Sequence, residues 1–279
     1  MTSAPLRTLN DGTTLPAIGF GTYPMRGEEG VAAVVSALAA GYRLLDTAVN
    51  YENETEVGAA IRESGVAREE IVVASKIPGR HHGYDEALAS VRDSLDRLGL
   101  DRIDLMLIHW PNPSLGKYPE AWRALIQARE DGLVRSIGVS NFTGAHLDRI
   151  IGETGVVPAV NQVELHPRFP QEEMRELHRR LGVVTAAWSP LGKGTAPLEE
   201  PAVVAAAEAH GVTPGQAILR WHLELGSLPI PKSADPERQR QNLDVFDFSL
   251  TDAEIEAISA LSVPNGRWFG GDPDVHEEM

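Results

Sequence analysis

Cysteine is absent from this chain of 279 residues. Without it the protein has no disulfide, no thiolate nucleophile and no zinc site built on cysteine. No apolar run approaches the length of a membrane-spanning helix, and the first residues, MTSAPLRTLNDG, lack the apolar core of a signal peptide. We therefore expect a cytoplasmic protein with no membrane partner.

Basic charge is scarce as well. The chain has 25 Lys and Arg against 40 Asp and Glu, and its formal net charge is −15. A groove for nucleic acid needs a basic face, so we expect no nucleic-acid partner. Linkers rich in Pro or Ser, low-complexity tracts and runs of like charge are also missing. One domain over residues 1–279 is the simplest organisation, and we expect a monomer.

Short apolar runs alternate with longer helical patterns along the whole chain. The runs predict strands at 17–20, 43–46, 71–76, 105–109, 136–140, 159–163, 183–188 and 228–232. The helical patterns fall at 28–40, 84–98, 119–131, 143–153, 170–181, 213–225 and 251–261. Glycine follows many of them, as is typical of left-handed helix ends, and Thr213 with Gln216 predicts a capping box.

Eight strands in β-α alternation predict a parallel sheet closed into a (β/α)8 TIM barrel, an α/β fold. A doubly wound sheet alternates in the same way, but it normally carries a glycine-rich phosphate turn after its first strand. Here that turn reads GFGTYP at 19–24, with no third glycine. Residues 6–18 predict an N-terminal β-hairpin that could cover one barrel mouth. Pro229, within the last expected strand, is a mild objection to that strand.

Polar side chains gather at the carboxyl ends of these strands. In chain order they are Asp46, Lys76, His109, Ser140-Asn141, Asn161-Gln162, Trp188-Ser189 and Lys232-Ser233. Taken singly, His109 could be a satisfied core histidine, Asp46 a helix cap and Lys76 a solvated strand end. In a barrel, however, these ends converge on the rim that holds the active site. An aspartate, a lysine and a histidine meeting there would perturb one another's pKa values, which favours a catalytic site.

The other histidines indicate no metal site. His81 and His82 are adjacent, so a regular element cannot turn both toward one ion. The remaining candidates, His166, His178, His210 and His222, lack a paired spacing with carboxylates. We interpret them as polar residues on the surface or on helices.

Seven segments in order resemble successive signatures of the aldo-keto reductase superfamily. They are LLDTAVNYENETEVGAAI (44–61), IVVASK (71–76), DLMLIHWP (104–111), SIGVSNF (136–142), NQVELHP (161–167), AWSPLGKG (187–194) and IPKSADPERQRQN (230–242). Together they cover nearly the whole chain. Within the family, the short chain and Trp188 are most similar to bacterial 2,5-diketo-D-gluconate reductase-type enzymes.

The resemblance implies NADPH-dependent reduction of aldehydes and ketones without a metal, catalysed by Asp46, Tyr51, Lys76 and His109. Hydride attack on a carbonyl carbon builds negative charge on its oxygen, and a phenol with a pKa of about 10 is a protonated donor at neutral pH. We expect Lys76 to lower the pKa of Tyr51 and Asp46 to keep Lys76 charged. His109 would hydrogen-bond the carbonyl oxygen and align the substrate.

The same matching implies the cofactor contacts. They are Gly21, Thr22, Ser140, Asn141, Gln162, Trp188, Ser189, Leu191, Gly192, Lys232, Ser233, Arg238, Gln241 and Asn242. Three amide and hydroxyl positions, 140, 141 and 162, match those that bind the nicotinamide carboxamide, and Trp188 replaces the stacking Tyr usual in the family. Lys232, Ser233 and Arg238 match the 2′-phosphate site, so NADPH should be preferred. Gln241 stands where the family often has Glu.

Substrate preference is the least determined property. The pocket is expected to be lined by Tyr23, Val49, Trp110, Trp268 and Phe269, and to take a small-molecule carbonyl such as a sugar-derived keto acid, a keto ester or a small dicarbonyl. A second hypothesis is an NADPH-binding regulatory or redox-sensing protein with little turnover. A barrel lyase or isomerase without nicotinamide would leave the 2′-phosphate residues unexplained.

Overall fold

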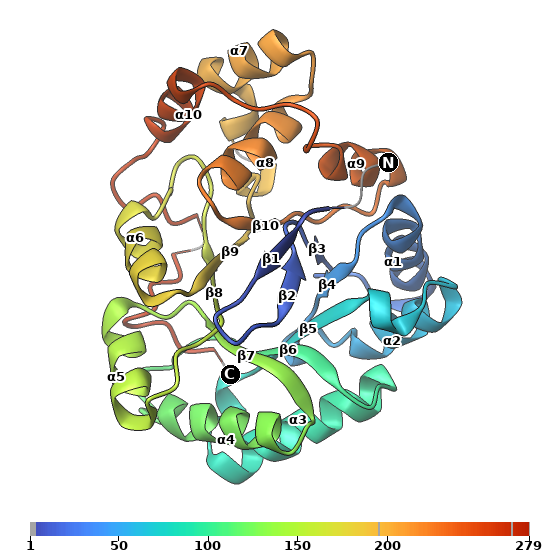
Figure 1. Ribbon diagram of the computed structural model, residues 1–279, viewed down its shortest axis with the longest axis vertical. Helices are drawn as coiled ribbons and strands as arrows, with labels where there is room; N and C mark the ends of the chain where they lie inside the picture. The colour runs from blue at the N-terminus through green and yellow to red at the C-terminus, as the bar shows by residue number, and fades with distance from the viewer. Residues whose placement is uncertain (1–3, 195, 269, 279) are drawn as a thin grey trace.

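An eight-stranded parallel sheet forms the centre of the computed structural model, which describes residues 4–194, 196–268 and 270–278 (Figure 1). Its strands are β3 (Phe20–Gly21), β4 (Leu44–Asp46), β5 (Val72–Ile77), β6 (Ile103–Ile108), β7 (Val134–Ser140), β8 (Val160–Glu164), β9 (Val184–Trp188) and β10 (Leu228–Ile230). They neighbour one another in sequence order. Gly19 and Gly21 donate their N–H groups to the carbonyls of Pro229 and Pro231 over 3.0 Å, which joins the first strand to the last. The predicted TIM barrel is confirmed.

The seam of the barrel explains the largest difference between predicted and observed strand boundaries; away from it, β6 and β7 begin at 103 and 134 rather than at 105 and 136. Strand β3 begins at Phe20 rather than at 17, and β10 ends at Ile230 rather than at 232. Proline has no N–H, so Pro229 and Pro231 contribute only carbonyls to this seam. At this seam the prolines supply hydrogen-bond acceptors but no donors, so the regular segments of β3 and β10 are short. Pro229 is therefore compatible with its strand.

Helices surround the barrel (Figure 1). The α-helices are α1 (Gly27–Ala40), α2 (Glu54–Glu63), α3 (Tyr84–Leu98), α4 (Tyr118–Glu130), α5 (Gly144–Thr154), α6 (Glu172–Leu181), α7 (Pro201–His210), α8 (Pro214–Glu224), α9 (Pro236–Leu243) and α10 (Asp252–Ser259). Short 3₁₀ turns are η1 (Val49–Tyr51), η2 (Arg68–Glu70), η3 (Gly79–His81), η4 (Gly192–Gly194) and η5 (Ala196–Glu199). The predicted capping box of α8 is confirmed. Helices α2, α7 and α9 were not expected; α7, PAVVAAAEAH, is too uniformly apolar to reveal a helical face.

The predicted hairpin closes one mouth of the barrel. Its strands, β1 (Leu6–Thr8) and β2 (Thr14–Pro16), lie over the barrel centre in Figure 1. Asn10 donates to the carbonyl of Pro158, just before β8, over 2.9 Å. Leu9 and Leu15 pack into the apolar barrel interior. The N-terminal mouth is thus sealed, and the strands' carboxyl ends face the opposite mouth.

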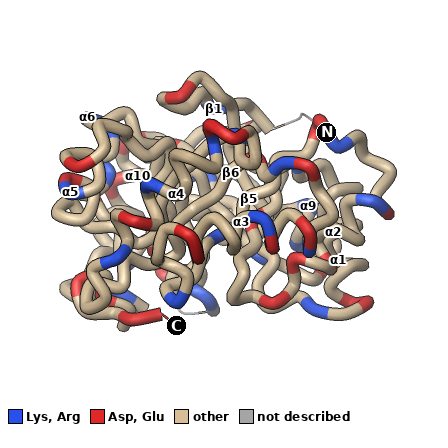
Figure 2. Tube along the Cα trace, turned by 90° about the horizontal axis from the view of Figure 1, so that it is seen from below, with Lys and Arg blue, Asp and Glu red and all other residues tan. Residues whose placement is uncertain are grey.

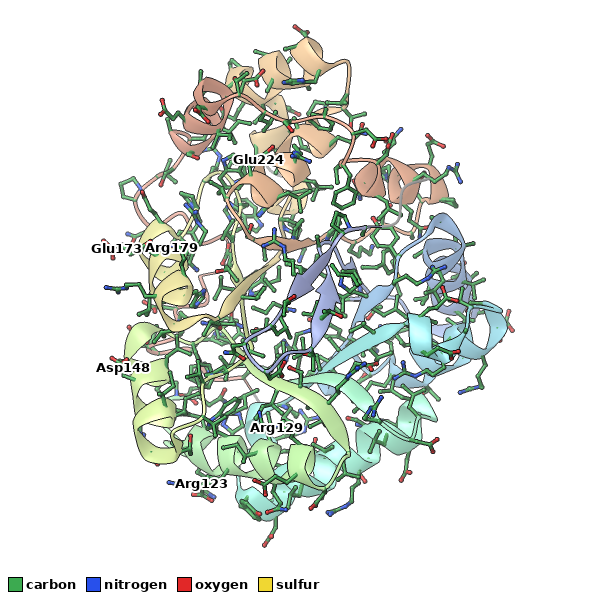
Figure 3. All side chains as sticks on the ribbon, viewed as in Figure 1. Arg123, Arg129, Asp148, Glu173, Arg179 and Glu224 are labelled. Atoms are coloured by element: carbon green, nitrogen blue, oxygen red, sulfur yellow. The ribbon has the colours of Figure 1, made fainter. Side chains whose placement is uncertain are left out.

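Charged residues lie mainly on the outer helices. Acidic and basic residues are interspersed along these helices in Figure 2, and labelled side chains on α4, α5, α6 and α8 appear in Figure 3. The apolar faces of the same helices pack on the sheet in one large core cluster. Among the described residues, none of the helices is both long and apolar enough to cross a bilayer.

Candidate active site

Four predicted catalytic side chains meet at the open mouth of the barrel: Asp46, Tyr51, Lys76 and His109, here called the catalytic cluster. Register explains the first pair, because Asp46 pairs with Ala74, and Lys76, two residues further along β5, faces the same side. Lys76 Nζ lies 2.7 Å from Asp46 Oδ1 and donates to the Tyr51 hydroxyl over 3.4 Å. The Tyr51 and His109 rings are almost perpendicular, with centroids 5.7 Å apart. The four predicted catalytic residues are therefore brought together.

Burial and charge set the protonation of this cluster. Lys76 is fully buried, which by itself lowers its pKa, but Asp46 and Tyr51 outweigh burial and the pKa is raised. Lys76 therefore remains an ammonium. Burial raises the pKa of Tyr51, and this exceeds the lowering by Lys76, so the net direction is upward. We expected a net lowering; the structure differs because the phenol is largely withdrawn from water and Asp46 also lies close.

Neighbouring residues of the first signature hold the cluster in place. Lys76 Nζ also donates to the carbonyl of Thr47 over 2.9 Å, and the Thr47 hydroxyl donates to Asn53 over 2.6 Å. Asn53 in turn donates to the carbonyl of Met25 over 3.0 Å. Glu54, at the start of α2, accepts from the hydroxyl of Ser75 on β5. Asn53 and Glu54 thus fix the loop that carries Tyr51.

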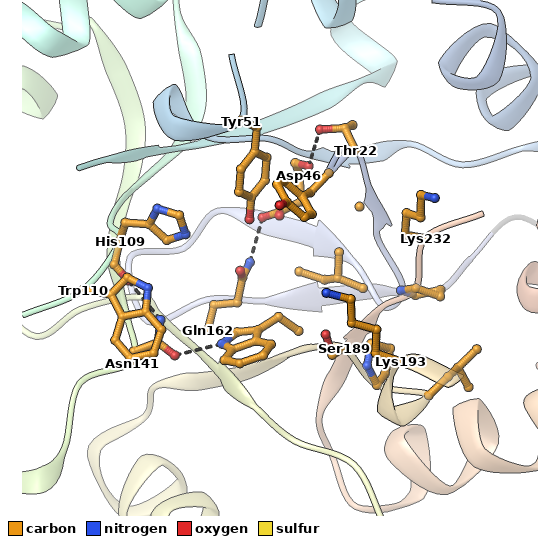
Figure 4. A pocket seen from close by; sticks show the side chains of 17 residues that line it. Thr22, Asp46, Tyr51, His109, Trp110, Asn141, Gln162, Ser189, Lys193 and Lys232 are labelled. Carbon is orange, nitrogen blue, oxygen red and sulfur yellow. Dashed lines mark hydrogen bonds between the residues drawn. The ribbon is translucent and has the colours of Figure 1, made fainter. Parts of the chain in front are cut away.

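A cavity of about 420 Å³ opens above the cluster (Figure 4). It is lined by Gly21, Thr22, Tyr23, Asp46, Tyr51, His109, Trp110, Asn141, Gln162, Trp188, Ser189, Pro190, Leu191, Lys193, Ile230, Pro231 and Lys232. Lys76 lies buried beneath its floor. Of the predicted substrate residues, Tyr23 and Trp110 line the cavity, whereas Val49 and the half-exposed Trp268 do not, and Phe269 lies outside the described residues.

Amide side chains form the wall opposite Tyr51. Gln162 Nε2 donates to Asp46 Oδ2 over 2.7 Å, which ties this wall to the catalytic cluster. Trp188 Nε1 donates to Asn141 Oδ1 over 2.8 Å, and the Ser140 hydroxyl donates to the carbonyl of Gln162 over 2.8 Å. These bonds order the amides and orient the indole; Figure 4 shows the bond between Gln162 and Asp46 and the one that Asn141 accepts. An amide oxygen such as Gln162 Oε1 can then accept from a carboxamide, and the Trp188 ring offers a stacking surface.

The far end of the cavity is basic. Lys232 lines it, and so does Lys193, which the sequence reasoning missed. Ser233 is buried and its hydroxyl accepts from the N–H of Asp235 over 3.1 Å. Asp235 caps α9 by accepting from the N–H of Arg238, whose side chain is exposed in the first helical turn. Amides and an indole at one end with ammonium groups at the other fit a phosphorylated dinucleotide.

Other predicted cofactor residues lie around this basic end. Leu191 lines the cavity and Gly192 begins the turn η4. Gln241 donates to Glu237 over 3.3 Å on the surface of α9, while Asn242 is nearly buried. Neither residue of this pair lines the cavity, so their contact with adenine stays a prediction.

Four histidines are buried rather than at the surface, although His178 and His222 do lie on helices, α6 and α8, as expected. His82, His166, His178 and His222 are buried, with at most 2% of each side chain exposed. His178 contacts Thr185 on β9 over 2.8 Å, and His222 contacts Ser227 over 3.0 Å. Burial lowers the pKa of His178 to about 4 and that of His222 to about 3, so both are neutral. These rings fill polar gaps between helices and sheet, which a local sequence pattern does not reveal.

Comparison with known proteins agrees with this geometry. The family model described as "Aldo/keto reductase family" matches residues 17–263. The chain is 60% identical to the 2,5-diketo-D-gluconic acid reductase B of Corynebacterium sp. (strain SHS752001) over 100% of both chains. An aldo/keto reductase from Brucella melitensis shares 47% identity and a TM-score of 0.90, covering 93% of this chain and 100% of its own.

A further solved structure is that of Gox0644, as a mutant in complex with NADPH. It is 40% identical, has a TM-score of 0.94, and covers 99% of this chain and 100% of its own. The family match, the full-length relative and the shared barrel all agree with the signatures that follow the strands. The chain belongs to the aldo/keto reductase family of oxidoreductases.

Proposed function

We propose that this protein reduces aldehydes and ketones to alcohols with NADPH, using Tyr51 as the general acid. The observation that carries the proposal is the buried ammonium of Lys76, paired with Asp46 and 3.4 Å from the Tyr51 hydroxyl. This arrangement lies at the floor of a cavity whose far end is basic. NADPH agrees with the predicted 2′-phosphate residues and with the solved NADPH complex in the family.

Each residue of the catalytic cluster has its own role in carbonyl reduction. NADPH, when bound, supplies hydride to the carbonyl carbon. The protonated Tyr51 hydroxyl gives its proton to the carbonyl oxygen as negative charge develops there. Lys76 stabilises the phenolate that remains, and Asp46 holds Lys76 charged and in position. His109, whose ring centroid lies 5.7 Å from that of Tyr51, orients the substrate oxygen.

The amide wall and the basic end of the cavity would orient the cofactor. Asn141 and Gln162 would hold the carboxamide, with the indole of Trp188 against the ring. Lys232, Ser233 and Arg238 would take the 2′-phosphate, with Gln241 and Asn242 at the adenine. Lys193, which lines the basic end of the cavity, is a further candidate for a phosphate contact.

Substrates are proposed among keto acids, sugar-derived carbonyls and small dicarbonyls. The name of the 60% identical relative, 2,5-diketo-D-gluconic acid reductase B, supports this class. Tyr23 and Trp110 give the cavity mouth aromatic walls, and its size suits a small polar carbonyl beside a nicotinamide.

The direct test is the loss of NADPH absorbance with a panel of aldehydes, keto acids and dicarbonyls. Turnover of at least one class is expected. Tight NADPH binding without turnover of any panel member would instead favour a redox-sensing protein. The cofactor assignment is tested with Arg238→Ala, which should weaken NADPH about tenfold or more and leave NADH almost unchanged, because one charge-assisted contact is worth about 1.5–3 kcal/mol. Equal weakening of both cofactors would remove the 2′-phosphate assignment.

A further inference from the structure

The end of the chain returns to the active-site mouth. Figure 2 shows β1 and the C-terminal end on opposite sides of the barrel. The His276 ring packs on Trp110 with centroids 4.1 Å apart, and Glu277 accepts from the N–H of Ser114 over 2.8 Å. Asn112 donates to the carbonyl of Glu278. The tail is therefore docked on the loop that follows β6, next to His109.

Close packing beneath the tail fixes the position of its last described residue. A Cβ on Gly79, in the loop after β5, would overlap the carbonyl oxygen of Glu278. Backbone contact this close requires a glycine at position 79. The tail thus fits between the loops after β5 and β6, and this packing fixes the position of the Glu278 carboxylate.

The Glu278 carboxylate lies against the imidazole of His109. Glu278 Oε1 lies 2.7 Å from His109 Nδ1, and the two side chains are only 15% and 11% exposed. Burial by itself raises the pKa of Glu278, but His109, Asn50 and Lys76 outweigh it and the pKa is lowered. The group is therefore an ionised carboxylate, which only accepts hydrogen bonds.

An ionised carboxylate constrains the proton on the neighbouring ring. The contact is too bent for a regular hydrogen bond, yet an oxygen lone pair and a nitrogen lone pair would repel each other at 2.7 Å. Nδ1 must then carry the proton, whatever the state of the other ring nitrogen. Because Nδ1 faces the tail, Nε2 is the nitrogen left for a ligand in the cavity that His109 lines.

We propose that Glu278 is a positioning residue for carbonyl reduction, which holds the His109 ring in place with its proton on Nδ1 and directs Nε2 to the substrate. The inference rests on the proposed function. The C-terminal end of the chain thereby completes the active site from outside the barrel. Its role resembles that of the outer hydrogen-bond partners that fix the tautomer of functional histidines in other sites.

The test compares Glu278→Ala and Glu278→Gln with the control Glu277→Gln, which removes a charge from the same tail but keeps an oxygen that accepts from the N–H of Ser114 and does not touch His109. Steady-state kinetics and NADPH affinity are measured, together with the ¹⁵N NMR signals of the His109 imidazole. Glu278→Ala should lower kcat/KM for the carbonyl about tenfold, mainly through kcat, and leave NADPH affinity unchanged. Glu278→Gln should fall between, because its amide oxygen can take the place of the carboxylate oxygen beside Nδ1–H without the negative charge. Glu277→Gln should match the original protein, because the acceptor for the N–H of Ser114 is kept.

The NMR signals separate this inference from the proposed function. In the original protein and in Glu277→Gln the proton should reside on Nδ1, and in Glu278→Ala it should redistribute between the two ring nitrogens. An unchanged kcat/KM and an unchanged Nδ1 proton in Glu278→Ala would overturn the inference and leave the reductase proposal standing. If no carbonyl is turned over by any form, the function fails, and the Nδ1 signals alone decide the role of Glu278. Should Glu278→Ala not fold, Glu278→Gln supplies both readings.

Discussion

Two groups of buried titratable side chains in this barrel differ in charge. In the catalytic cluster, Lys76 and Asp46 are withdrawn from water and remain an ion pair. Behind the sheet, His178 and His222 are equally buried and remain neutral. The partners explain the difference, because Lys76 has a carboxylate at 2.7 Å, whereas the histidines have hydroxyl, amide and carbonyl groups.

This difference separates buried groups that serve chemistry from those that serve packing. A buried ion pair contributes little net stability, since desolvation offsets much of the attraction. The neutral histidines satisfy nearby polar groups without that cost. A charged pair kept at the floor of a cavity is therefore better explained by its proposed control of the Tyr51 proton than by stability.

The largest effect is expected from Tyr51→Phe. The variant keeps the ring, which packs near His109, but loses the hydroxyl that Lys76 contacts. Carbonyl reduction should fall by about 10²–10⁴-fold, the usual contribution of a general acid, while NADPH affinity stays the same. Stopped-flow NADPH oxidation and a binding titration measure the two quantities. Near-normal turnover would mean that the charged cluster, like the histidines, is structural.

A large loss of stability is expected from Lys76→Met. The substitution leaves Asp46 buried with a charge and only neutral donors such as Gln162 around it. Breaking a buried pair from one side costs about 3–5 kcal/mol in the free energy of unfolding. Urea unfolding at neutral pH measures this loss.

The matched control for Lys76→Met removes both charges. Asp46→Asn combined with Lys76→Met should recover much of the lost stability, because no unpaired charge remains, yet it should stay inactive. The double variant would then resemble the histidine region, being buried, neutral and without chemistry. A double variant as unstable as the single one would show that shape, rather than charge, governs this site.

The fold was predictable because its signals are local. Each barrel strand is a short apolar run, and glycines end the helices with positive φ at Gly99, Gly132 and Gly182 among others. Two of the helices that escaped prediction have weak patterns: α7 has no polar face, although Gly211 ends it with positive φ, and α9 is short and polar. Boundaries shifted most at the seam, where Pro229 and Pro231 pair through carbonyls alone.

The candidate site was predictable in part. Residues at strand ends, such as Asp46, Lys76 and His109, converge because parallel strands bring their carboxyl ends together. Glu278 reaches His109 through the docking of a tail, and no spacing in the sequence encodes that contact. The direction of the Tyr51 pKa shift was likewise predicted wrongly, because the burial that raises this pKa depends on packing from several elements.

The smallest effect concerns the neutral histidines and is a dependence of stability on pH. The folded-state pKa of His222 is about 3, against 6.5 for an unperturbed histidine. Between these values the unfolded chain binds the proton and the folded chain does not, so the free energy of unfolding falls as pH decreases from 6.5. At pH 4 the share of His222 is about 3 kcal/mol, because each pKa unit corresponds to about 1.4 kcal/mol. The free energy of unfolding from urea titrations, plotted against pH, should fall less for His222→Gln than for the original protein, by this amount at pH 4. Between pH 7 and 8 the two plots should be parallel, because the ring is neutral in both the folded and the unfolded state. Curves that stayed parallel down to pH 4 would show that His222 is protonated inside the fold, and its contrast with the charged cluster would disappear.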